Sequence, residues 1–598
     1  MRLRHRILAA GVAGVALVPA LAVTALADPG VRAGDTTSPV EKKRVDSVPT
    51  PKLAWYKCYE IAECATVRLP LDYDDPKGAT TEIAVLRVKA RNAKKRIGSL
   101  FVNPGGPGGQ GTALAYQAGQ FLGADVLDRF DVVGFDPRGI GFSSNVACFK
   151  STKDQTLAMA GLNVAFPMGA KEEAAYIKSA TAVGKGCSTT GKKLAGAMST
   201  AEAARDMEVL RRSVGDKKLT YLGFSYGTAL GQYYANMFPD RLRSVVVDGV
   251  LNPVSWAGTP KTAGQILDDR LRSADGAYKA LKEILVRCAK AGKEKCQFAQ
   301  FGDPAKNFDV LAQRLKTKPV DIQGEKVTYA DFVGATLGNL YDPSGYLFID
   351  AMATDLWKAT SSTSTAAQAT AARKALAARI AERRAEVARQ KNAAEKVTAK
   401  DFPYDNGLDA FSSVVCTDGL HPKKAGNWPA AVAASDKRAP YFGRAWDWGS
   451  VQCAGDAWKV RDEDAYTGPF NRRTNAPVLF VGDYYDPATN YDDAVSSSKL
   501  LPNSRLLSSN SWGHTAYGTS ACVTNAIEGY LVSGTLPPAG KVCVGDVQPF
   551  EGDGGPAVAT RGPADASAMA AQAGTEARGP KLAPVAVRVP KSILLGTR

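Results

Sequence analysis

Histidine is nearly absent from this sequence: its 598 residues include only three, His5, His421 and His514. No C-x-x-C pair occurs among the ten cysteines. Structural zinc sites are built from clustered cysteine and histidine, so we expect no metal site, and we also expect no cofactor. The scarcity has a second consequence, because any chemistry that needs a histidine base has to use one of these three residues.

Long apolar runs are also missing beyond the first residues, and no later stretch reaches the length needed to cross a bilayer. The chain opens with the basic segment "MRLRHR" and an apolar run that closes on Ala25-Leu26-Ala27. This order is typical of a secretory signal peptide, which we place at residues 1–27. No cysteine follows the cleavage site to carry a lipid anchor. We therefore expect a secreted, extracellular protein with no transmembrane segment in its mature form.

Nucleotide-binding signatures are absent: no glycine-rich loop ends in G-K-[ST], and none of the form G-x-G-x-x-G opens a helix. The chain is nevertheless basic, with a formal net charge of +16. Much of that charge lies in residues 366–400, an alanine-rich helical pattern with nine Lys or Arg against three Glu. An exposed helix explains such a segment, and contact with an anionic cell envelope is the alternative. We expect no nucleic-acid partner, since the chain carries no recognition motif.

The ten cysteines fall as neighbours along the chain, which suits an exported protein with local disulfides. Sequence alone does not fix connectivity, but five neighbouring bridges are the simplest pairing. They would join Cys58 with Cys64, Cys148 with Cys187, Cys288 with Cys296, Cys416 with Cys453, and Cys522 with Cys543.

Strand-like and helix-like segments alternate over residues 51–250 and return at 471–548, which predicts an α/β fold with a mostly parallel sheet covered by helices on both faces. Between them, residues 251–470 carry helical patterns, as expected of a helical lid inserted into the core. Residues 28–50 are polar and contain proline, and we interpret them as a leader or propeptide. The tail at 549–598 is rich in Ala, Gly and Pro and is expected to be disordered.

One short motif carries chemistry: Gly223-Phe224-Ser225-Tyr226-Gly227 follows a β-favouring segment and precedes a helical pattern. A strand that turns straight into a helix leaves its central residue on a strained corner. The flanking glycines relieve clashes there. This G-x-S-x-G pattern is typical of a nucleophile elbow, which exposes the serine oxygen at the edge of the sheet.

A serine needs a base and an orienting carboxylate. His5 leaves with the signal peptide and His421 lies in the helical region, so His514, after the last strand signal, is the expected base. Asp486 is the preferred acid because it stands in the loop after the preceding strand, and Asp483 is its competitor. Two further aspartates, Asp492 and Asp493, are better explained as turn or cap residues. Serine, acid and histidine then follow the chain order of α/β-hydrolases.

The oxyanion of an acyl-transfer intermediate needs backbone donors. Tyr226 N–H, directly after the serine, is one expected donor. The glycine-rich loop "NPGGPGGQG" at 103–111, which follows another strand signal, suits the second.

Seven motifs in order, "NPGGPGGQG", "DVVGFDPRGIGFS", "STAEAARDMEVLR", "YLGFSYGT", "VVCTDG", "GDYYDPAT" and "GHT", resemble those of exported tripeptidyl aminopeptidases of high-GC Gram-positive bacteria. These are prolyl-aminopeptidase-like α/β-hydrolase serine peptidases, and the likeness spans about residues 55–547. It implies the α/β-hydrolase fold, the triad Ser225, Asp486 and His514, and Gly106 as the oxyanion glycine. Pro104 stands where the related H-G-G-P-G loop has its histidine.

The resemblance also implies a serine exopeptidase that releases short peptides, tripeptides in this family, from free N-termini of peptides or proteins through an acyl-enzyme. Such an enzyme must bind a protonated α-amine, and Asp418 in "VVCTDG" is the candidate carboxylate. Asp206, before the elbow, is expected to hold the core together instead. An exported carboxylesterase or lipase with the same triad is the alternative, and a non-catalytic envelope-binding protein is a third reading.

Overall fold

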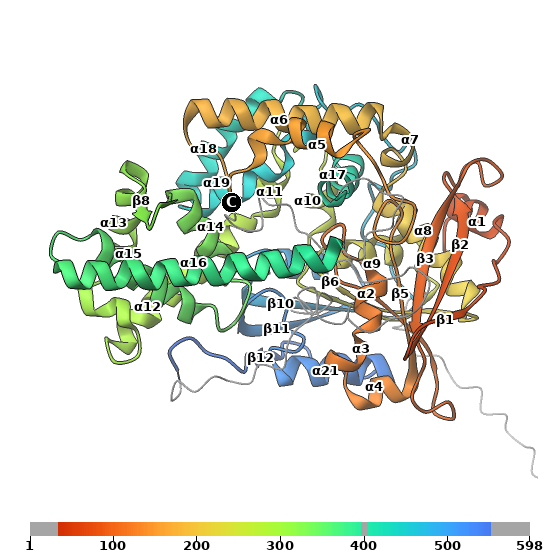
Figure 1. Cartoon of the computed structure of the whole chain (residues 1–598). Helices are drawn as coiled ribbons and strands as arrows, with labels where there is room; N and C mark the ends of the chain where they lie inside the picture. Colours follow the sequence, from red (N-terminus) through yellow and green to blue (C-terminus); the bar gives the residue numbers. More distant parts are fainter. Residues whose placement is uncertain (1–33, 396–404, 552–598) are drawn as a thin grey trace, which may run out of the picture. The chain divides into compact units, whose positions relative to one another are not determined.

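The computed structural model describes residues 34–395 and 405–551 (Figure 1). Within α16, introduced below, the side chains of residue 383 and of residues 386–395 are left out of the description. The expected signal peptide, the end of the basic segment and nearly all of the expected disordered tail lie outside the described residues. Among the residues described, no helix has the length and apolarity to span a membrane.

A ten-stranded sheet forms the centre of the described chain, and its strands run in the order β1-β2-β3-β5-β4-β6-β7-β10-β11-β12. The first three pair antiparallel, and the strands from β5 to β12 in this order pair parallel with one another. The prediction of a mostly parallel sheet is confirmed. The strands are β1 Tyr56–Tyr59, β2 Ala62–Pro70, β3 Thr80–Val88, β4 Gly98–Asn103, β5 Phe130–Phe135, β6 Leu219–Phe224, β7 Leu242–Asp248, β10 Val478–Tyr485, β11 Ser504–Trp512 and β12 Val542–Val544.

Helices cover both faces of this sheet, because its central strands are apolar on both sides and every residue of β4, β5 and β6 is buried. One face packs against α8 (Thr200–Ser213) and α9 (Tyr226–Met237). The other face packs against α2 (Gly111–Tyr116), α3 (Ala118–Phe121), α4 (Ala124–Arg129) and α21 (Ala521–Ser533), which lie together in Figure 1. Between β5 and α8 lie α5 (Thr152–Ala158), η1 (Ala160–Leu162), α6 (Gly169–Thr189) and α7 (Lys192–Ala195), and α20 (Tyr491–Leu500) joins β10 to β11.

A long helical insertion, residues 249–477, separates β7 from β10, although these two strands are neighbours in the sheet. Its only strands among the described residues are the hairpin β8 (Val320–Ile322) and β9 (Glu325–Val327). Its helices are α10 Pro253–Ala257, α11 Leu267–Leu271, α12 Ser273–Ala291, η2 Gln297–Phe301, α13 Pro304–Thr317, α14 Tyr329–Asn339, α15 Tyr346–Thr360, α16 Ala366–Glu395, α17 Gly407–Asp418, η3 Ala425–Asn427, α18 Trp428–Arg438, α19 Phe442–Asp447 and η4 Trp448–Cys453.

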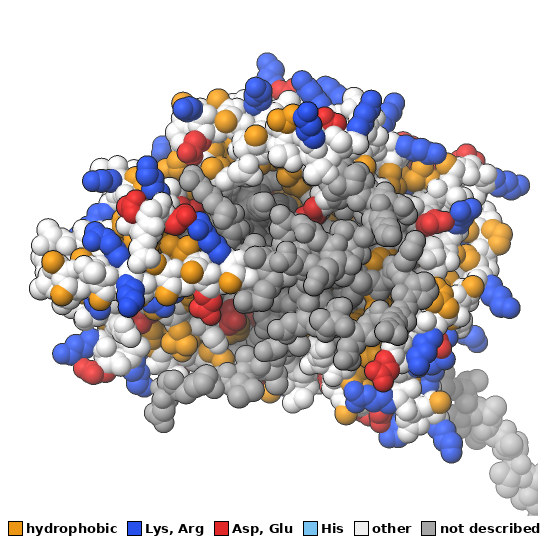
Figure 2. Space-filling view, viewed as in Figure 1, with side chains coloured by type: hydrophobic (Ala, Val, Ile, Leu, Met, Phe, Trp, Pro, Cys, Tyr) orange, Lys and Arg blue, Asp and Glu red, His pale blue; other side chains and the backbone are white. Residues whose placement is uncertain are grey.

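The basic segment begins the helix α16, which packs along α15. Several of its arginines are committed to neighbours within the chain. Arg379 pairs with Asp355, Arg384 Nη2 lies 2.7 Å from Glu325 Oε2, and Arg373 donates to the carbonyl of Ala359. Figure 2 shows Lys and Arg side chains spread over several elements of this face, including the α5–α6 region.

Residues 34–50, part of the expected leader or propeptide, are not a loose segment but pack into the fold. Ser38 caps the helix α1 (Pro39–Asp46), and Val45 is fully buried. Glu41 is buried too, and its carboxylate accepts hydrogen bonds from Arg205 Nε at 2.9 Å and Nη2 at 2.8 Å. The polar composition of this segment reflects ion pairs with distant residues. We call residues 34–50 the N-terminal strap.

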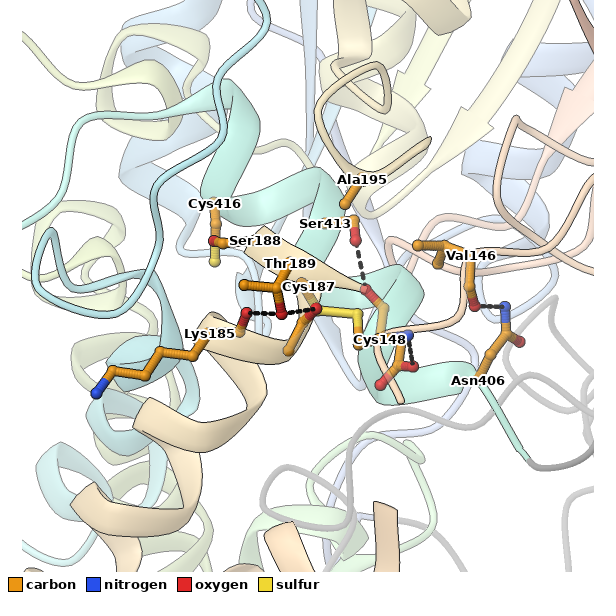
Figure 3. The surroundings of a disulfide bond; sticks show 12 residues. Val146, Cys148, Lys185, Cys187, Ser188, Thr189, Ala195, Asn406, Ser413 and Cys416 are labelled. Carbon is orange, nitrogen blue, oxygen red and sulfur yellow. Dashed lines mark hydrogen bonds between the residues drawn. A yellow bond between two sulfur atoms is a disulfide. The ribbon is translucent and has the colours of Figure 1, made fainter. Parts of the chain in front are cut away.

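All ten cysteines form disulfides, in the same five neighbouring pairs that the sequence analysis takes as simplest. Two of these bridges flank α17. Cys148–Cys187 joins the segment after β5 to α6 (Figure 3), and Cys416–Cys453 joins α17 to η4. Hydrogen bonds add to them, since Asn406 Nδ2 donates to the carbonyl of Val146 at 3.2 Å. The Cys416–Cys453 bridge and this hydrogen bond therefore hold α17 against its neighbours.

Candidate active site

Ser225 occupies the turn between β6 and α9 with φ 54° and ψ −126°, a strained conformation for a residue with a side chain. The flanking glycines explain how the turn closes. A Cβ at Gly223 would lie 2.5 Å from the Gly227 carbonyl oxygen, and one at Gly227 would lie 2.8 Å from Asn103 Oδ1. Ser225 is partly exposed although its neighbours on both sides are buried. The geometry is that of a nucleophile elbow.

The glycine-rich loop after β4 packs directly on this elbow. A Cβ at Gly105 would come within 2.4 Å of the Phe224 carbonyl oxygen and 2.9 Å of Tyr226 N, so only glycine fits there. As the first residue of α9, Tyr226 has a backbone N–H with no partner inside its helix. Gly105 rather than Gly106 makes the close approach, and Gly106 N–H stays a predicted oxyanion donor.

His514 follows β11, and its Nδ1 lies 2.9 Å from Asp486 Oδ2 and 3.0 Å from Oδ1. The carboxylate of Asp486 is buried and also accepts from Ala488 N at 2.8 Å and from Thr489 N and Oγ1 at 2.8 and 2.7 Å. Burial alone would raise the pKa of Asp486. The adjacent His514 and these donors lower it by a larger amount, so the net result is a lowered pKa. Asp486 therefore stays ionised and holds Nδ1–H, which leaves Nε2 of His514 to exchange a proton.

The serine, the acid and the histidine sit on loops at the carboxyl ends of neighbouring parallel strands. Ser225 N donates to the carbonyl of Asp248, the last residue of β7, at 3.0 Å. A Cβ on the next residue, Gly249, would meet Thr489 Oγ1 at 3.2 Å and His514 Cε1 at 3.3 Å. The loops after β6, β7, β10 and β11 thus converge on one edge of the sheet.

Asp483, the competing acid, does not reach His514. It lies within β10 and is buried, and neither of its carboxylate oxygens has a hydrogen-bond partner among the described residues. Burial and the charges of Asp248 and Asp486 raise the pKa of Asp483 well above its ordinary value. Asp492 and Asp493 lie in the first turn of α20, and His421 is half-buried, with its pKa lowered by desolvation to about 3.

Asp248 is a positioning residue that the sequence analysis misses. Its carboxylate accepts hydrogen bonds from the backbone of Ala516 at 3.1 Å and Tyr517 at 2.8 Å, just after His514. Burial raises its pKa to about 6. An aspartate at the end of the strand-like run "RSVVVDGV" is the signal that could have marked it.

Asp418 braces the elbow and is poorly placed to bind a substrate amine. It is 4 % exposed and accepts from Thr200 N at 2.6 Å, from Thr200 Oγ1 at 2.5 Å and from Trp256 Nε1 at 2.7 Å. Thr200 Oγ1 in turn lies 2.6 Å from Tyr226 Oη. Both oxygens of this carboxylate are committed to the protein, so its placement supports a positioning role. Asp206, as expected, holds the core through Arg138 and Tyr73.

The helical insertion touches each of these loops. The carbonyl of Tyr341 accepts from His514 N at 3.0 Å, and the two rings lie 5.3 Å apart edge to face. On α12, a Cβ at Gly276 would lie 2.6 Å from the Asp486 carbonyl oxygen. The ring of Trp256, on α10, lies 5.4 Å from that of Tyr226. The insertion therefore forms part of the site.

Three groups of acidic and cysteine side chains lie close enough together to be considered as metal ligands in the described chain. Two of them consist of a disulfide and an aspartate, and disulfide sulfurs are not thiolate ligands. In the third, Arg205 Nη1 lies 2.7 Å from both Glu202 Oε1 and Asp464 Oδ2 and supplies the positive charge. None of the three fits a metal ion well.

Comparison with known proteins gives two family matches. The family model for the alpha/beta hydrolase fold matches residues 98–287, and the one for TAP-like protein matches residues 439–543. The serine protease Hip1 of Mycobacterium tuberculosis is 29 % identical over 512 residues, which cover 81 % of this chain and 87 % of that protein. The tripeptidyl aminopeptidase of Streptomyces lividans is 27 % identical over 496 residues, 81 % and 84 % of the two chains. A carboxylesterase B of Mycobacterium tuberculosis is 28 % identical over 521 residues, 83 % and 91 %.

The sheet topology, the serine elbow and these matches define an α/β-hydrolase of the serine-hydrolase class, as predicted. Residues 439–543 are similar to the TAP-like family, and the relatives named above include peptidases.

Proposed function

We propose that this enzyme is a secreted serine exopeptidase that releases short peptides, tripeptides by analogy with its Streptomyces relative, from free N-termini. Ser225 attacks the peptide carbonyl, His514 takes its proton and returns it to the leaving amine, and Asp486 orients the imidazole. Tyr226 N–H and the 103–111 loop stabilise the oxyanion. The observation that carries the proposal is the strained, partly exposed Ser225 on the same sheet edge as the His514–Asp486 pair.

Secretion is supported by the signal-peptide pattern of residues 1–27 and by five disulfides, which persist in oxidising compartments. Contact with an anionic envelope through the basic segment has less support. Arg373, Arg379 and Arg384 on α16 already bind groups of the same chain.

An ester hydrolase with the same triad is the second candidate, because one relative of similar identity is a carboxylesterase. Four chromogenic substrates separate the two: a free-amine tripeptide, its N-acetylated form, a single free amino acid and a short acyl ester. We expect the free tripeptide to have the highest kcat/KM. Equal or faster turnover of the acetylated peptide or the ester would replace the exopeptidase with the esterase.

The pH profile should report the His514–Asp486 pair. Burial lowers the pKa of His514, but the charge and hydrogen bond of Asp486, with the charge of Asp248, raise it above its ordinary value of 6.5 overall. Acylation needs the neutral imidazole. Therefore kcat/KM should fall as the pH drops through a pKa above 6.5, measured with the ester, whose turnover involves no substrate amine.

Asp486→Asn removes the charge that raises this pKa, so the acid limb should move to lower pH and kcat should fall by about 10⁴-fold. A limb that stays in place in this variant would mean that another group controls the profile.

A further inference from the structure

The helical insertion contains a second group of carboxylates that the catalytic steps do not use: Asp268 and Asp269 on α11 and Asp447 at the end of α19. Helix α11 packs against both α19 and η4. Asp447 is fully buried, and neither of its oxygens has a hydrogen-bond partner among the described residues. A buried carboxylate without donors is costly unless a cation or a proton reaches it. We call these three residues the acidic cluster.

Local cations leave part of this cluster uncompensated. Arg438 Nη2 lies 2.7 Å from Asp269 Oδ1, but its Nε also binds Asp275, at 3.0 Å from Oδ2. Arg270, on the same helix, donates instead to carbonyls, to Ser255 at 2.8 Å and Trp256 at 3.2 Å among others.

Asp268 is the partly exposed member of the cluster that has no ion pair, whereas Asp269 is paired with Arg438. No other described residue donates a hydrogen bond to the carboxylate of Asp268 or forms an ion pair with it. Burial raises its pKa to about 7, and Arg270 only partly opposes this. A bound ammonium group would supply the missing charge and up to three donors.

The cluster lies beside the candidate active site. Tyr341 contacts His514, as described above. Burial is the largest cause of its raised pKa, and the charges of Asp486 and Asp268 raise this pKa as well. Tyr341 therefore lies within electrostatic range of both the triad acid and Asp268. From the other side, Arg270 binds the carbonyl of Trp256, whose ring packs on Tyr226. Helix α11 is thus linked to the elbow through Trp256.

We propose that Asp268, backed by Asp447, binds the protonated α-amine of the peptide substrate and so restricts cleavage to free N-termini. This assignment rests on the proposed exopeptidase function and gives its amine site to the insertion, in place of Asp418. An acetyl cap removes the charge and two of the donors, and it would leave the acidic cluster unpaired.

The test compares kcat/KM for the free tripeptide, the N-acetylated tripeptide and the acyl ester. In Asp268→Asn, turnover of the free tripeptide should fall by about 30- to 5,000-fold, the range for losing one side of a buried charge pair. The other two substrates should change by less than about threefold. Asp447→Asn is the second variant and should show a smaller loss with the same selectivity.

Two matched variants make the comparison specific. Asp303→Asn is the same chemical change at an exposed helix cap of the insertion, where asparagine caps equally well, and it should leave all three rates unchanged. Asp418→Asn should lower all three by a similar factor, because it weakens the brace behind Tyr226.

Equal losses on all three substrates in both cluster variants, or no loss in either, would overturn the amine site. If the wild type already cleaves the acetylated peptide as well as the free one, the exopeptidase function itself fails. If the wild type discriminates and Asp268→Asn discriminates equally, only the assignment to Asp268 fails.

Discussion

Ser225→Ala is expected to lower kcat by about 10⁴- to 10⁶-fold toward the free tripeptide and the acyl ester alike, the range seen when a serine nucleophile is removed. The elbow is closely packed on both sides, because Gly105 lies against the backbone of Phe224 and Gly227 lies against the side chain of Asn103. No neighbouring hydroxyl can take over the position without rebuilding this turn. Single-turnover hydrolysis and covalent labelling by a phosphonate probe, followed by intact mass, measure the loss.

Ser533→Ala is the matched control, because Ser533 is exposed at the end of α21 and its hydroxyl donates only to nearby groups. It should keep full activity and full labelling. Labelling of the Ser225→Ala protein, or activity within tenfold of wild type, would mean that another residue is the nucleophile.

Sequence reasoning reaches the candidate triad because the chain offers so few choices. Only His514 of three histidines follows the last strand signal, and only one serine stands in a glycine elbow at a strand–helix junction. Asp486 and Asp483 could be ranked by loop position alone. The structure joins His514 to Asp486 and buries Asp483 without a partner.

The amine-binding carboxylate could not be found in this way. Asp418 belongs to a motif in family order, but its partners are Thr200, 218 positions away, and Trp256, 162 positions away. The pair Asp268–Asp269 has no motif around it. Its proximity to Asp447 and Tyr341 depends on how α11, α19 and the 341 loop fold together, which local pattern does not encode.

In the fold, too, local patterns could be predicted from the sequence, whereas contacts between distant residues could not. Alternating strand and helix patterns predict the parallel sheet, because each apolar strand reports its own burial. Composition does not indicate that the N-terminal strap packs into the fold, since a polar segment there suggests a leader or propeptide. Its buried contacts, such as Glu41 with Arg205, span 164 positions, and the sequence gives no local sign of them.

Glu41→Ala should therefore destabilise the whole enzyme, lowering the free energy of unfolding by about 3 kcal/mol, the lower end of the range for breaking a buried ion pair. Arg205 is fully buried and would lose two hydrogen bonds, while Glu202 and Asp464 would still partner it. Denaturant unfolding of the mature protein measures the change. A separable leader would instead leave the unfolding midpoint unaltered.

Glu60→Ala is the control for this variant, because Glu60 is exposed between β1 and β2. Its unfolding midpoint should match that of the wild type.

The pH dependence of stability offers a second check. Burial alone would raise the pKa of Glu41, but Arg205 and Arg44 lower it by a larger amount, so that it lies below the ordinary 4.5. A group with a depressed pKa stabilises the fold above its unfolded pKa and loses that contribution as the pH falls through the folded one. The difference in stability between wild type and Glu41→Ala should thus be full at neutral pH and shrink below about pH 4.5. A difference that does not depend on pH would mean that packing of the strap, rather than the ion pair with Arg205, holds it in place.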